Sequence, residues 1–343
     1  MRHTFTHDAF MRKALVEARR TLGLTSPNPA VGAVLVIDGD IVAKGHHERA
    51  GGAHAEIECL RRFNKSIPKS AVLYVTLEPC STTGRTGPCT DAIIRAGIRH
   101  VVVGSTDPNP QHAGRGIEIL ESAGLDVRSG VLADECSALN EAYNKWITTR
   151  RPFVIAKCGM SLDGRLAAPP GEKRWITSAA SRRHAHRLRA QVDAILIGAE
   201  TLRADNPRLT VRGVRGAKQP WRIVVSRSGA LPREAHLFTD RFADRTIVGN
   251  AGSLDSVLRD AGEKEITSVL IEGGGKILGQ ALDQHLVDKV QLYLGPVLIG
   301  GPIVAFAGLG VGRTGEAPRL DRVRYERIGE DVCITGYTAY DAI

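Results

Sequence analysis

One histidine and two cysteines constrain this chain more than any other feature of its sequence. His54 is followed two residues later by Glu56, and Cys80 and Cys89 each follow a proline, with eight residues between the two cysteines. One imidazole and two thiolates make three protein ligands, which leaves the fourth position of a tetrahedral zinc ion for water. Mixed nitrogen and sulfur ligation favours zinc over other divalent ions. The chain is therefore predicted to fold so that these separate segments meet at one metal site.

The open position and Glu56 together predict hydrolytic chemistry. Zinc lowers the pKa of a bound water to about 7, and Glu56 can carry a proton from that water to a departing amine. The order His-x-Glu, Pro-Cys and Cys is the signature of zinc deaminases that act on nucleobases. In the commonest form two residues separate the cysteines, whereas eight do so here. The alternative, a helix-capping histidine with two buried cysteines, accounts neither for Glu56 nor for the two Pro-Cys pairs.

The other cysteines and histidines are predicted to be structural. Four cysteines without such neighbours are expected to be apolar packing residues: Cys59, Cys136, Cys158 and Cys333. Three histidines are expected to be surface or packing residues: His46, His47 and His100. The six cysteines are irregularly spaced, and no apolar stretch precedes the first charges. Reduced thiols and a cytoplasmic location are therefore expected.

The pattern of elements predicts two α/β domains, 1–148 and 152–343, in a chain of 343 residues. Helices are expected over 8–22, 54–63, 89–96, 115–123 and 134–148, and strands over 30–37, 41–44, 71–77 and 100–104. This alternation predicts an α/β/α layered domain. The polar stretch 149–152 ends in proline and marks the boundary. Further strands are expected over 153–157, 194–198, 222–226, 246–249, 268–271, 289–294, 322–328 and 332–338.

Charge and hydropathy limit the classes of partner. The net charge is +9, with 18 Lys+Arg against 16 Asp+Glu up to residue 150 and 28 against 21 beyond it. Such an excess serves nucleic acid or small phosphorylated ligands, and 5% aromatic residues without a basic and aromatic cluster disfavour nucleic acid. Residues 290–312 carry no charge, but two prolines and six glycines favour a strand and a loop over a membrane span.

Weaker signals in the second half point to a phosphate-bearing ligand. Glu272 is followed by three glycines and Lys276, between a predicted strand and a predicted helix. Such a run lets backbone amides approach a phosphate, although a simple tight turn fits equally, and it lacks the Rossmann pattern. The stretches 157–165 and 205–212 are interpreted as charged loops after strands, where ligands bind in α/β sheets. Solvated turns are the alternative.

Over its whole length, the chain resembles the bifunctional riboflavin-biosynthesis deaminase/reductases of bacteria. The motifs PNPAVG at 27–32, DPNP at 107–110 and GRG at 114–116 match the deaminase half. Motifs of the reductase half follow in order at 157–165, 175–177, 189–190, 201–212 and 272–274. The resemblance implies a cytidine-deaminase-like N-terminal domain, a dihydrofolate-reductase-like C-terminal domain, and the cofactors Zn²⁺ and NADPH.

The resemblance also implies residue roles. The zinc ligands and the catalytic proton carrier would be His54, Cys80, Cys89 and Glu56. The NADPH contacts would be Met160, Trp175, Thr201, Asp205, and the loop 274–280 with Gly274 and Gly275. The substrate contacts would be Asn28, Lys173, Arg189, Leu209, Arg212 and Glu272, with both arginines binding the phosphate bidentately.

The implied substrate is a small phosphorylated pyrimidine. The first domain would remove the C2 amine of a diaminopyrimidinone ribosyl phosphate, and the second would reduce the ribosyl group to a ribityl chain with NADPH. Family members also suggest a homodimer formed through the reductase domain. Two alternatives stay open: a deaminase of nucleic-acid bases with a C-terminal binding module, and a relative in which only one half is active.

Four places depart from the family pattern. Thr82 replaces a usual histidine, Gly87 a proline, and Lys173 a substrate-binding serine. The pair Ser226 and Arg227 stands where Asp-Ser is common. We hypothesise that Arg227 approaches the 2′-phosphate of the cofactor.

Overall fold

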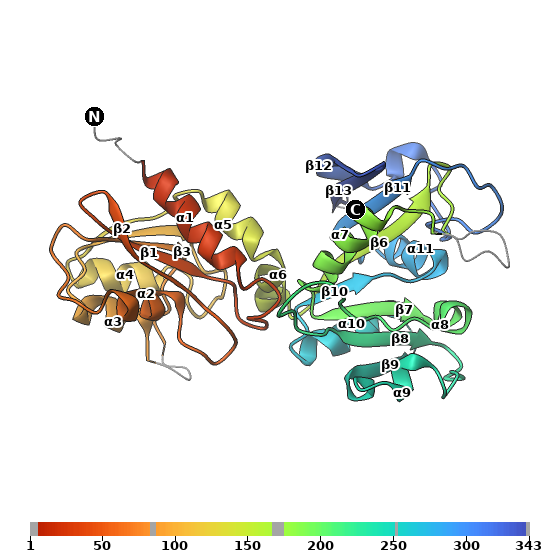
Figure 1. Ribbon diagram of the computed structural model, residues 1–343, viewed down its shortest axis with the longest axis horizontal. Helices are drawn as coiled ribbons and strands as arrows, with labels where there is room; N and C mark the ends of the chain where they lie inside the picture. Colours follow the sequence, from red (N-terminus) through yellow and green to blue (C-terminus); the bar gives the residue numbers. More distant parts are fainter. Residues whose placement is uncertain (1–5, 83–86, 167–174, 251–252, 341–343) are drawn as a thin grey trace. The chain divides into compact units, whose positions relative to one another are not determined.

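A computed structural model describes residues 6–82, 87–166, 175–250 and 253–340. The chain divides into two compact units, Met1–Arg150 and Arg151–Ile343. Each unit has its own β-sheet covered by helices (Figure 1).

The first unit contains a five-stranded sheet in the order β2-β1-β3-β4-β5. Its strands are β1 (Gly32–Ile37), β2 (Asp40–His46), β3 (Val72–Leu77), β4 (His100–Ser105) and β5 (Asp126–Arg128). β1 runs antiparallel to β2 and β3, whereas β3, β4 and β5 are parallel. The parallel strands direct their carboxyl ends to one edge, which is where ligands bind in open α/β sheets.

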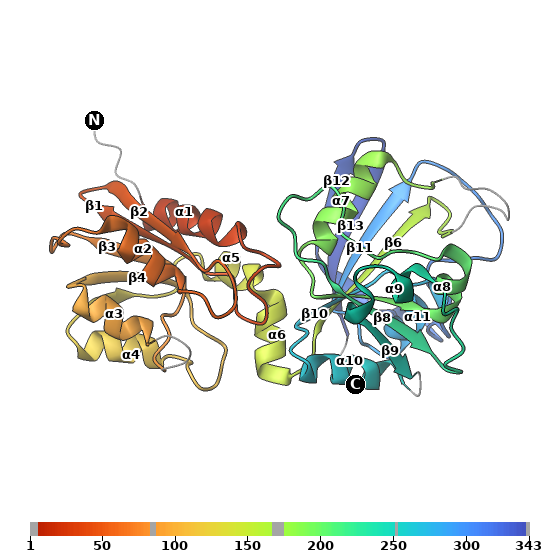
Figure 2. The same cartoon turned by 60° about the horizontal axis from the view of Figure 1, so that its bottom comes forward.

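Helices cover both faces of this sheet. They are α1 (His7–Arg19), α2 (Ala55–Phe63), α3 (Cys89–Arg95), α4 (Arg115–Ser122) and α5 (Ala133–Leu139), and α6 (Glu141–Thr149) follows α5 at the end of the unit. Apolar residues of α1 and α5 form a core with one face, and those of α2, α3 and α4 form a core with the other (Figures 1 and 2). Gly45 permits the close approach of α2, because a Cβ there would lie 2.3 Å from the carbonyl oxygen of Ala55. The predicted α/β/α layering is confirmed.

The helix predicted over 134–148 is wrong, because the structure divides it into α5 and α6 at Asn140. The backbone of Asn140 leaves the helical region (φ −110°, ψ 27°). Its side-chain amide accepts a hydrogen bond from the Ala30 N–H at 2.8 Å and donates one to the Ala30 carbonyl at 3.0 Å. This long-range pairing fixes the break. The three-residue strand β5 was not predicted, because it is too short to show a period.

The second unit contains an eight-stranded sheet in the order β12-β13-β11-β6-β10-β7-β8-β9. Its strands are β6 (Phe153–Ser161), β7 (Ala194–Gly198), β8 (Trp221–Ser226), β9 (Thr246–Asn250), β10 (Ser268–Ile271), β11 (Lys289–Gly295), β12 (Arg319–Ile328) and β13 (Asp331–Ala339). Strand β13 is antiparallel to both of its neighbours, and the other pairs are parallel.

The α-helices of this unit are α7 (Ala179–Arg189), α8 (Ala199–Asp205), α9 (His236–Thr239), α10 (Leu254–Glu263) and α11 (Gly275–Asp283), with short 3₁₀ turns at Ala243–Arg245 and Thr314–Glu316. Helices α10 and α11 contribute to the main apolar core of the sheet, whereas α7 packs over Tyr293, Ile328 and Cys333. The prediction of an α/β fold for the second domain is therefore confirmed.

Three local predictions in this unit are wrong. Strand β6 continues to Ser161, four residues beyond the predicted strand 153–157, so the first part of the stretch 157–165 is strand and not loop. Asp205 ends helix α8 and does not follow a strand directly. The stretch 274–280 belongs to the start of α11 and is not a loop. Across the described ranges of the chain, no helix is long and apolar enough to cross a membrane.

Candidate active sites

Three elements bring the predicted metal ligands together. His54 caps the start of α2, Cys80 lies in the loop after β3, and Cys89 is the first residue of α3. The Nδ1 atom of His54 lies 3.2 Å from the Cys89 Sγ and 3.4 Å from the Cys80 Sγ. The three ligand atoms lie within 4.8 Å of one another. One nitrogen and two sulfurs converging in this way fit a tetrahedral zinc ion with an open position.

The two thiols differ in their tendency to ionise. The pKa of Cys80 is lowered to about 4, chiefly because Cys89 donates a hydrogen bond to its sulfur. The pKa of Cys89 is raised, because it holds that proton and is buried. Of the two cysteines, only Cys89 lies at the start of a helix. The backbone N–H at the start of α3 nevertheless donates to the Cys80 sulfur at 3.3 Å, so this helix end stabilises the Cys80 thiolate.

Glu56 lies in the first turn of α2, next to the ligands, with 3% of its surface exposed. Burial raises the pKa of its carboxyl group to about 7, although the charge of His54 opposes the shift. A carboxyl group that gains and loses a proton near neutrality is suited to general acid–base catalysis.

His47, predicted to be a surface or packing residue, lies at this site. Its ring is 5.4 Å from that of His54, edge-on. Its Nδ1 lies 2.9 Å from the Ala53 carbonyl and its other nitrogen 3.1 Å from the Asn28 amide nitrogen. Because a carbonyl can only accept, Nδ1 carries the hydrogen, and the other nitrogen accepts from Asn28. Burial lowers the pKa of His47, which favours this neutral form.

The other two histidines behave as predicted. His46 pairs with the buried Glu17 at 3.2 Å, and His100 pairs with Asp126 on the surface at 3.1 Å. The four cysteines outside the motif are buried and free. The approach of His47 to His54 depends on the turn between β2 and α2, and its spacing of seven residues was the only signal in the sequence.

Glu78 is a second residue that the sequence did not single out. It precedes the Pro-Cys pair of the first thiolate ligand and is 4% exposed. One carboxylate oxygen accepts hydrogen bonds from the N–H groups of Gly116 (2.8 Å) and Ile117 (3.4 Å). The other accepts from Asp107 (3.1 Å) and Gly114 (3.0 Å). Glu78 thereby ties the loop 107–117 to the strand end that carries Cys80.

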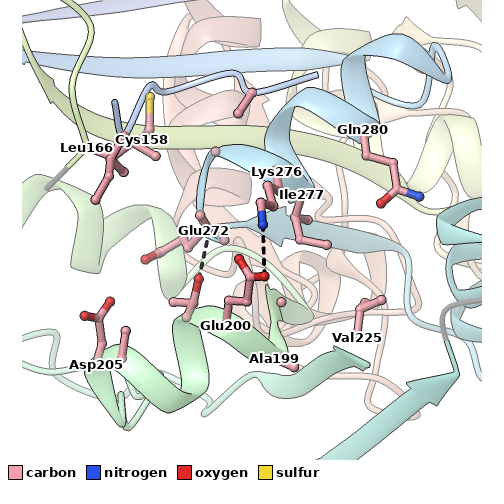
Figure 3. A pocket seen from close by; sticks show the side chains of 18 of the residues that line it. Cys158, Leu166, Ala199, Glu200, Asp205, Val225, Glu272, Lys276, Ile277 and Gln280 are labelled. Carbon is pink, nitrogen blue, oxygen red and sulfur yellow. Dashed lines mark hydrogen bonds and ion pairs between the residues drawn. The ribbon is translucent and has the colours of Figure 1, made fainter. Parts of the chain in front are cut away.

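The second site is a pocket of about 1050 Å³ at the carboxyl ends of the parallel strands (Figure 3). It is lined by most of the residues predicted to contact the cofactor: Trp175, Thr201, Asp205, Gly274 and Gly275. Ser226 and Arg227 also line it. Met160 is not among the lining residues, and it packs against the core, with its sulfur 3.9 Å from that of Cys158.

The glycine run shapes one wall of this pocket. Helix α11 begins at Gly275, where a Cβ would lie 2.0 Å from the Val304 carbonyl oxygen, so only glycine fits. The preceding N–H, that of Gly274, donates to the Thr201 hydroxyl at 2.9 Å. Lys276 pairs with Glu200 of α8 at 3.0 Å across the wall, as Figure 3 shows. A helix start that faces a pocket suits the phosphates of a dinucleotide.

Glu272 and Lys157 line the pocket as well and belong to a cluster of charged side chains. Arg189 donates two hydrogen bonds of 2.7 Å to this carboxylate and a third of 3.1 Å to the Thr210 carbonyl. The Nζ of Lys157 lies 3.7 Å from the same carboxylate. Burial alone would raise the pKa of Glu272, but the charges of Arg189 and Lys157 lower it to about 2. Glu272 is therefore ionised, and it engages the guanidinium of Arg189, to which the family resemblance assigned phosphate binding.

The structure separates the other predicted substrate residues. Arg212 is exposed and contacts His186 of α7. Leu209 is buried with a positive φ of 49° and does not line the pocket. Lys173 lies outside the described residues. Asn28 belongs to the first unit, beside His47.

Comparison with known proteins defines the class. Residues 5–105 match the family model of the cytidine and deoxycytidylate deaminase zinc-binding region, and residues 152–334 match that of the RibD C-terminal domain. The chain thus joins a zinc-binding deaminase domain to a reductase domain.

Relatives match over nearly the full length. The riboflavin biosynthesis protein RibD of Synechocystis is 40% identical, with 95% of each chain covered. The Acinetobacter baumannii RibD structure superposes with a TM-score of 0.89 at 32% identity, covering 97% of this chain and 98% of that one. A Thermotoga maritima diaminohydroxyphosphoribosylaminopyrimidine deaminase/5-amino-6-(5-phosphoribosylamino)uracil reductase gives 0.89 at 34% identity, with the same coverage.

The chain therefore belongs to the RibD family of bifunctional deaminase/reductases of riboflavin biosynthesis. Because the likeness covers both units, a nucleic-acid deaminase with a separate binding module is not favoured.

Proposed function

We propose that the chain converts 2,5-diamino-6-(ribosylamino)pyrimidin-4-one 5′-phosphate in two steps. Residues 1–148 deaminate the pyrimidine with the help of Zn²⁺, and residues 152–343 then reduce the ribosyl group to a ribityl chain with NADPH. The convergence of His54, Cys80 and Cys89 beside the buried Glu56 carries the proposal. The Thermotoga relative, whose name includes both activities, supports the substrate class.

In the deaminase step, His54, Cys80 and Cys89 hold the metal. Zinc supplies Lewis-acid activation of water when bound. Glu56 accepts a proton from that water and passes it to the amine at C2, which leaves as ammonia while the water oxygen stays on the ring. Asn28, held by its hydrogen bond to His47, orients the pyrimidine.

In the reductase step, the pocket residues hold the nucleotide: Trp175, Thr201, Asp205, Gly274 and Gly275. NADPH supplies a hydride for C1 of the ribosyl group when bound. The chain contributes orientation, with the ionised Glu272 fixed by Arg189 at the edge of the pocket and Arg212 beyond it. Met160 as a cofactor contact, and Leu209 and Lys173 as substrate contacts, stay predictions.

The remaining partners are also predictions. A small phosphorylated pyrimidine agrees with the basic second half, and we expect neither nucleic acid nor a membrane as a partner. A homodimer or higher homo-oligomer is expected from the family. Six free cysteines agree with a cytoplasmic setting.

A coupled assay tests the proposal. The purified, zinc-loaded chain is given the diaminopyrimidinone ribosyl phosphate and NADPH, while ammonia and NADPH absorbance are followed. Ammonia release followed by NADPH consumption is expected. Glu56→Gln should lower ammonia release by about 10²–10⁴-fold while keeping its zinc, and added deaminated compound should restore NADPH consumption. Ammonia without NADPH consumption would reject the reductase assignment, and no ammonia with zinc bound would reject the substrate.

A further inference from the structure

His186, which neither the sequence motifs nor the proposed function singles out, lies next to the charged group at Glu272. It belongs to α7, three residues before Arg189, and its ring is partly buried. Its Nδ1 lies 3.2 Å from the backbone nitrogen of Arg212, and its Nε2 lies 3.4 Å from the guanidinium Nη2 of the same residue. Neither residue lines the pocket itself.

These two contacts cannot both be hydrogen bonds. A neutral imidazole carries one N–H and one acceptor nitrogen, and an arginine guanidinium has only donors. If Nδ1 accepts from the backbone N–H of Arg212, then Nε2 carries the hydrogen and points it at another donor. In the opposite tautomer Nδ1 carries the hydrogen, and it then faces the backbone N–H of Arg212, which is also a donor. In the first form, an imidazole N–H and a guanidinium N–H converge on a position that only an acceptor can satisfy.

The charges around His186 indicate what that acceptor is. Lys157 on β6, Arg189 on α7 and Arg212 in the loop after α8 face it, against the single carboxylate of Glu272. Three cations and one anion leave a net charge of about +2, which matches the charge of −1.5 to −2 of a phosphate monoester. Burial and the neighbouring cations lower the pKa of His186 to about 4, against the opposing effect of Glu272. The imidazole is therefore neutral near pH 7.

We propose that His186 and Arg212 bind one oxygen of the substrate phosphate together, with His186 acting as a neutral N–H donor. This inference rests on the proposed function, because it assigns the phosphate of that substrate to a position beyond Glu272. It also explains why the guanidinium of Arg189 can remain hydrogen-bonded to Glu272. The phosphate is bound by His186 and Arg212, and Arg189 attracts it mainly through its charge.

The test uses the zinc-loaded full chain and ribose 5-phosphate, with ribose as the control that lacks the phosphate. Titration calorimetry should show that His186→Ala weakens binding of ribose 5-phosphate by about tenfold or more, as expected for loss of a hydrogen bond to a charged group. His186→Gln, which keeps a neutral N–H donor, should retain most of the affinity. Arg187→Ala removes an exposed cation from the same helix and should leave binding unchanged.

The pH dependence separates a neutral donor from a cation. The ratio of the wild-type to the His186→Gln affinity should stay constant between about pH 6 and 8, because the ionisation of the phosphate itself affects both proteins equally. A ratio that rises as the pH falls through the ordinary histidine range would show a charged imidazolium and overturn the neutral-donor claim. In a double-mutant cycle, His186→Ala and Arg212→Ala should be non-additive, because they share one oxygen.

Failure of the inference can be told apart from failure of the proposed function. If the wild type consumes NADPH and His186→Ala has an unchanged KM and ribose 5-phosphate affinity, the inference is rejected and the function stands. If ribose 5-phosphate binding depends on His186 in a chain that never consumes NADPH with the deaminated substrate, the inference stands and the reductase assignment is rejected. Should His186→Ala fail to fold, His186→Gln and Arg212→Ala carry the same comparison.

Discussion

Replacing Glu78 by glutamine should destabilise the first unit although the side chain keeps its shape. The buried carboxylate is an acceptor for four backbone N–H groups, two on each oxygen. A glutamine amide presents one oxygen and one NH₂ group. Whichever way the amide turns, two N–H groups lose their acceptor and face a donor. One of these is always a buried group, that of Asp107 or that of Gly116.

The magnitude follows from these contacts. A buried donor left without a partner costs about 1–3 kcal/mol, so two of them, one only partly buried, give about 3 kcal/mol. With a urea m-value of about 2 kcal/mol per molar for a unit of this size, the midpoint of unfolding should fall by about 1.5 M. The loop 107–117 should open first, because Glu78 is its link to the strand end that carries Cys80.

Urea titration followed by hydrogen-exchange mass spectrometry measures this effect in the first unit separately from the second. Glu121→Gln is the matched control, because Glu121 is exposed in the last turn of α4, and its free energy of unfolding should change by no more than about 0.5 kcal/mol. A Glu78→Gln variant whose stability and loop protection equal those of the control would refute the reasoning. It would mean that water satisfies these N–H groups.

Three further predictions concern the metal, the buried ion pair and the cofactor. Cys80→Ser should lower the zinc content, measured by emission spectrometry, by at least about tenfold, and it should stop ammonia release. NADPH consumption with the deaminated substrate should continue. Loss of both activities would contradict the assignment of the two reactions to separate sites. Because the pKa of Glu272 is lowered from 4.5 to about 2, its charge stabilises the second unit above pH 4.5, and this contribution is lost as the pH falls toward 2. The urea midpoint of residues 151–343 should therefore fall over that range in the wild type and less in Glu272→Gln; equal slopes would exclude the pair as the cause. Arg227→Ala should weaken NADPH binding more than NADH binding in a fluorescence titration, whereas unchanged NADPH affinity would refute contact with the 2′-phosphate.

The metal site was predictable because its ligands and its proton carrier lie at short, recognisable spacings in the sequence. Glu56 follows His54 by two residues, and Cys80 and Cys89 each follow a proline at the ends of a strand–loop–helix segment. Within each short stretch, the local structure fixes the relative positions of the side chains. The sheet then brings the two stretches together. The layered fold was predictable for a similar reason, since the hydrophobic period of each element is local.

The residues that support the site could not be found in the same way, because their partners are distant. Asn140 breaks a helix by pairing with Ala30, which lies 110 positions away, and Glu78 bonds to Gly116, 38 positions away. Both look unremarkable in sequence, as a helical asparagine and a charged residue before a proline. Only the folded chain shows that one amide and one carboxylate satisfy backbone groups that would otherwise be buried without partners.

The second site shows how far a resemblance can direct such reasoning. It assigned Arg189 and Arg212 the same role, yet α7 directs the first to Glu272, 83 positions away in the sequence, and leaves the second exposed beside His186. A motif gives the residue types, but the order of the strands decides which charged side chains meet. Glu272, just after β10, lies between Lys157 of β6 and Arg189 of α7. Glu272 engages the guanidinium of Arg189, and for this reason the site proposed above assigns the phosphate to Arg212 and to the neutral N–H group of His186.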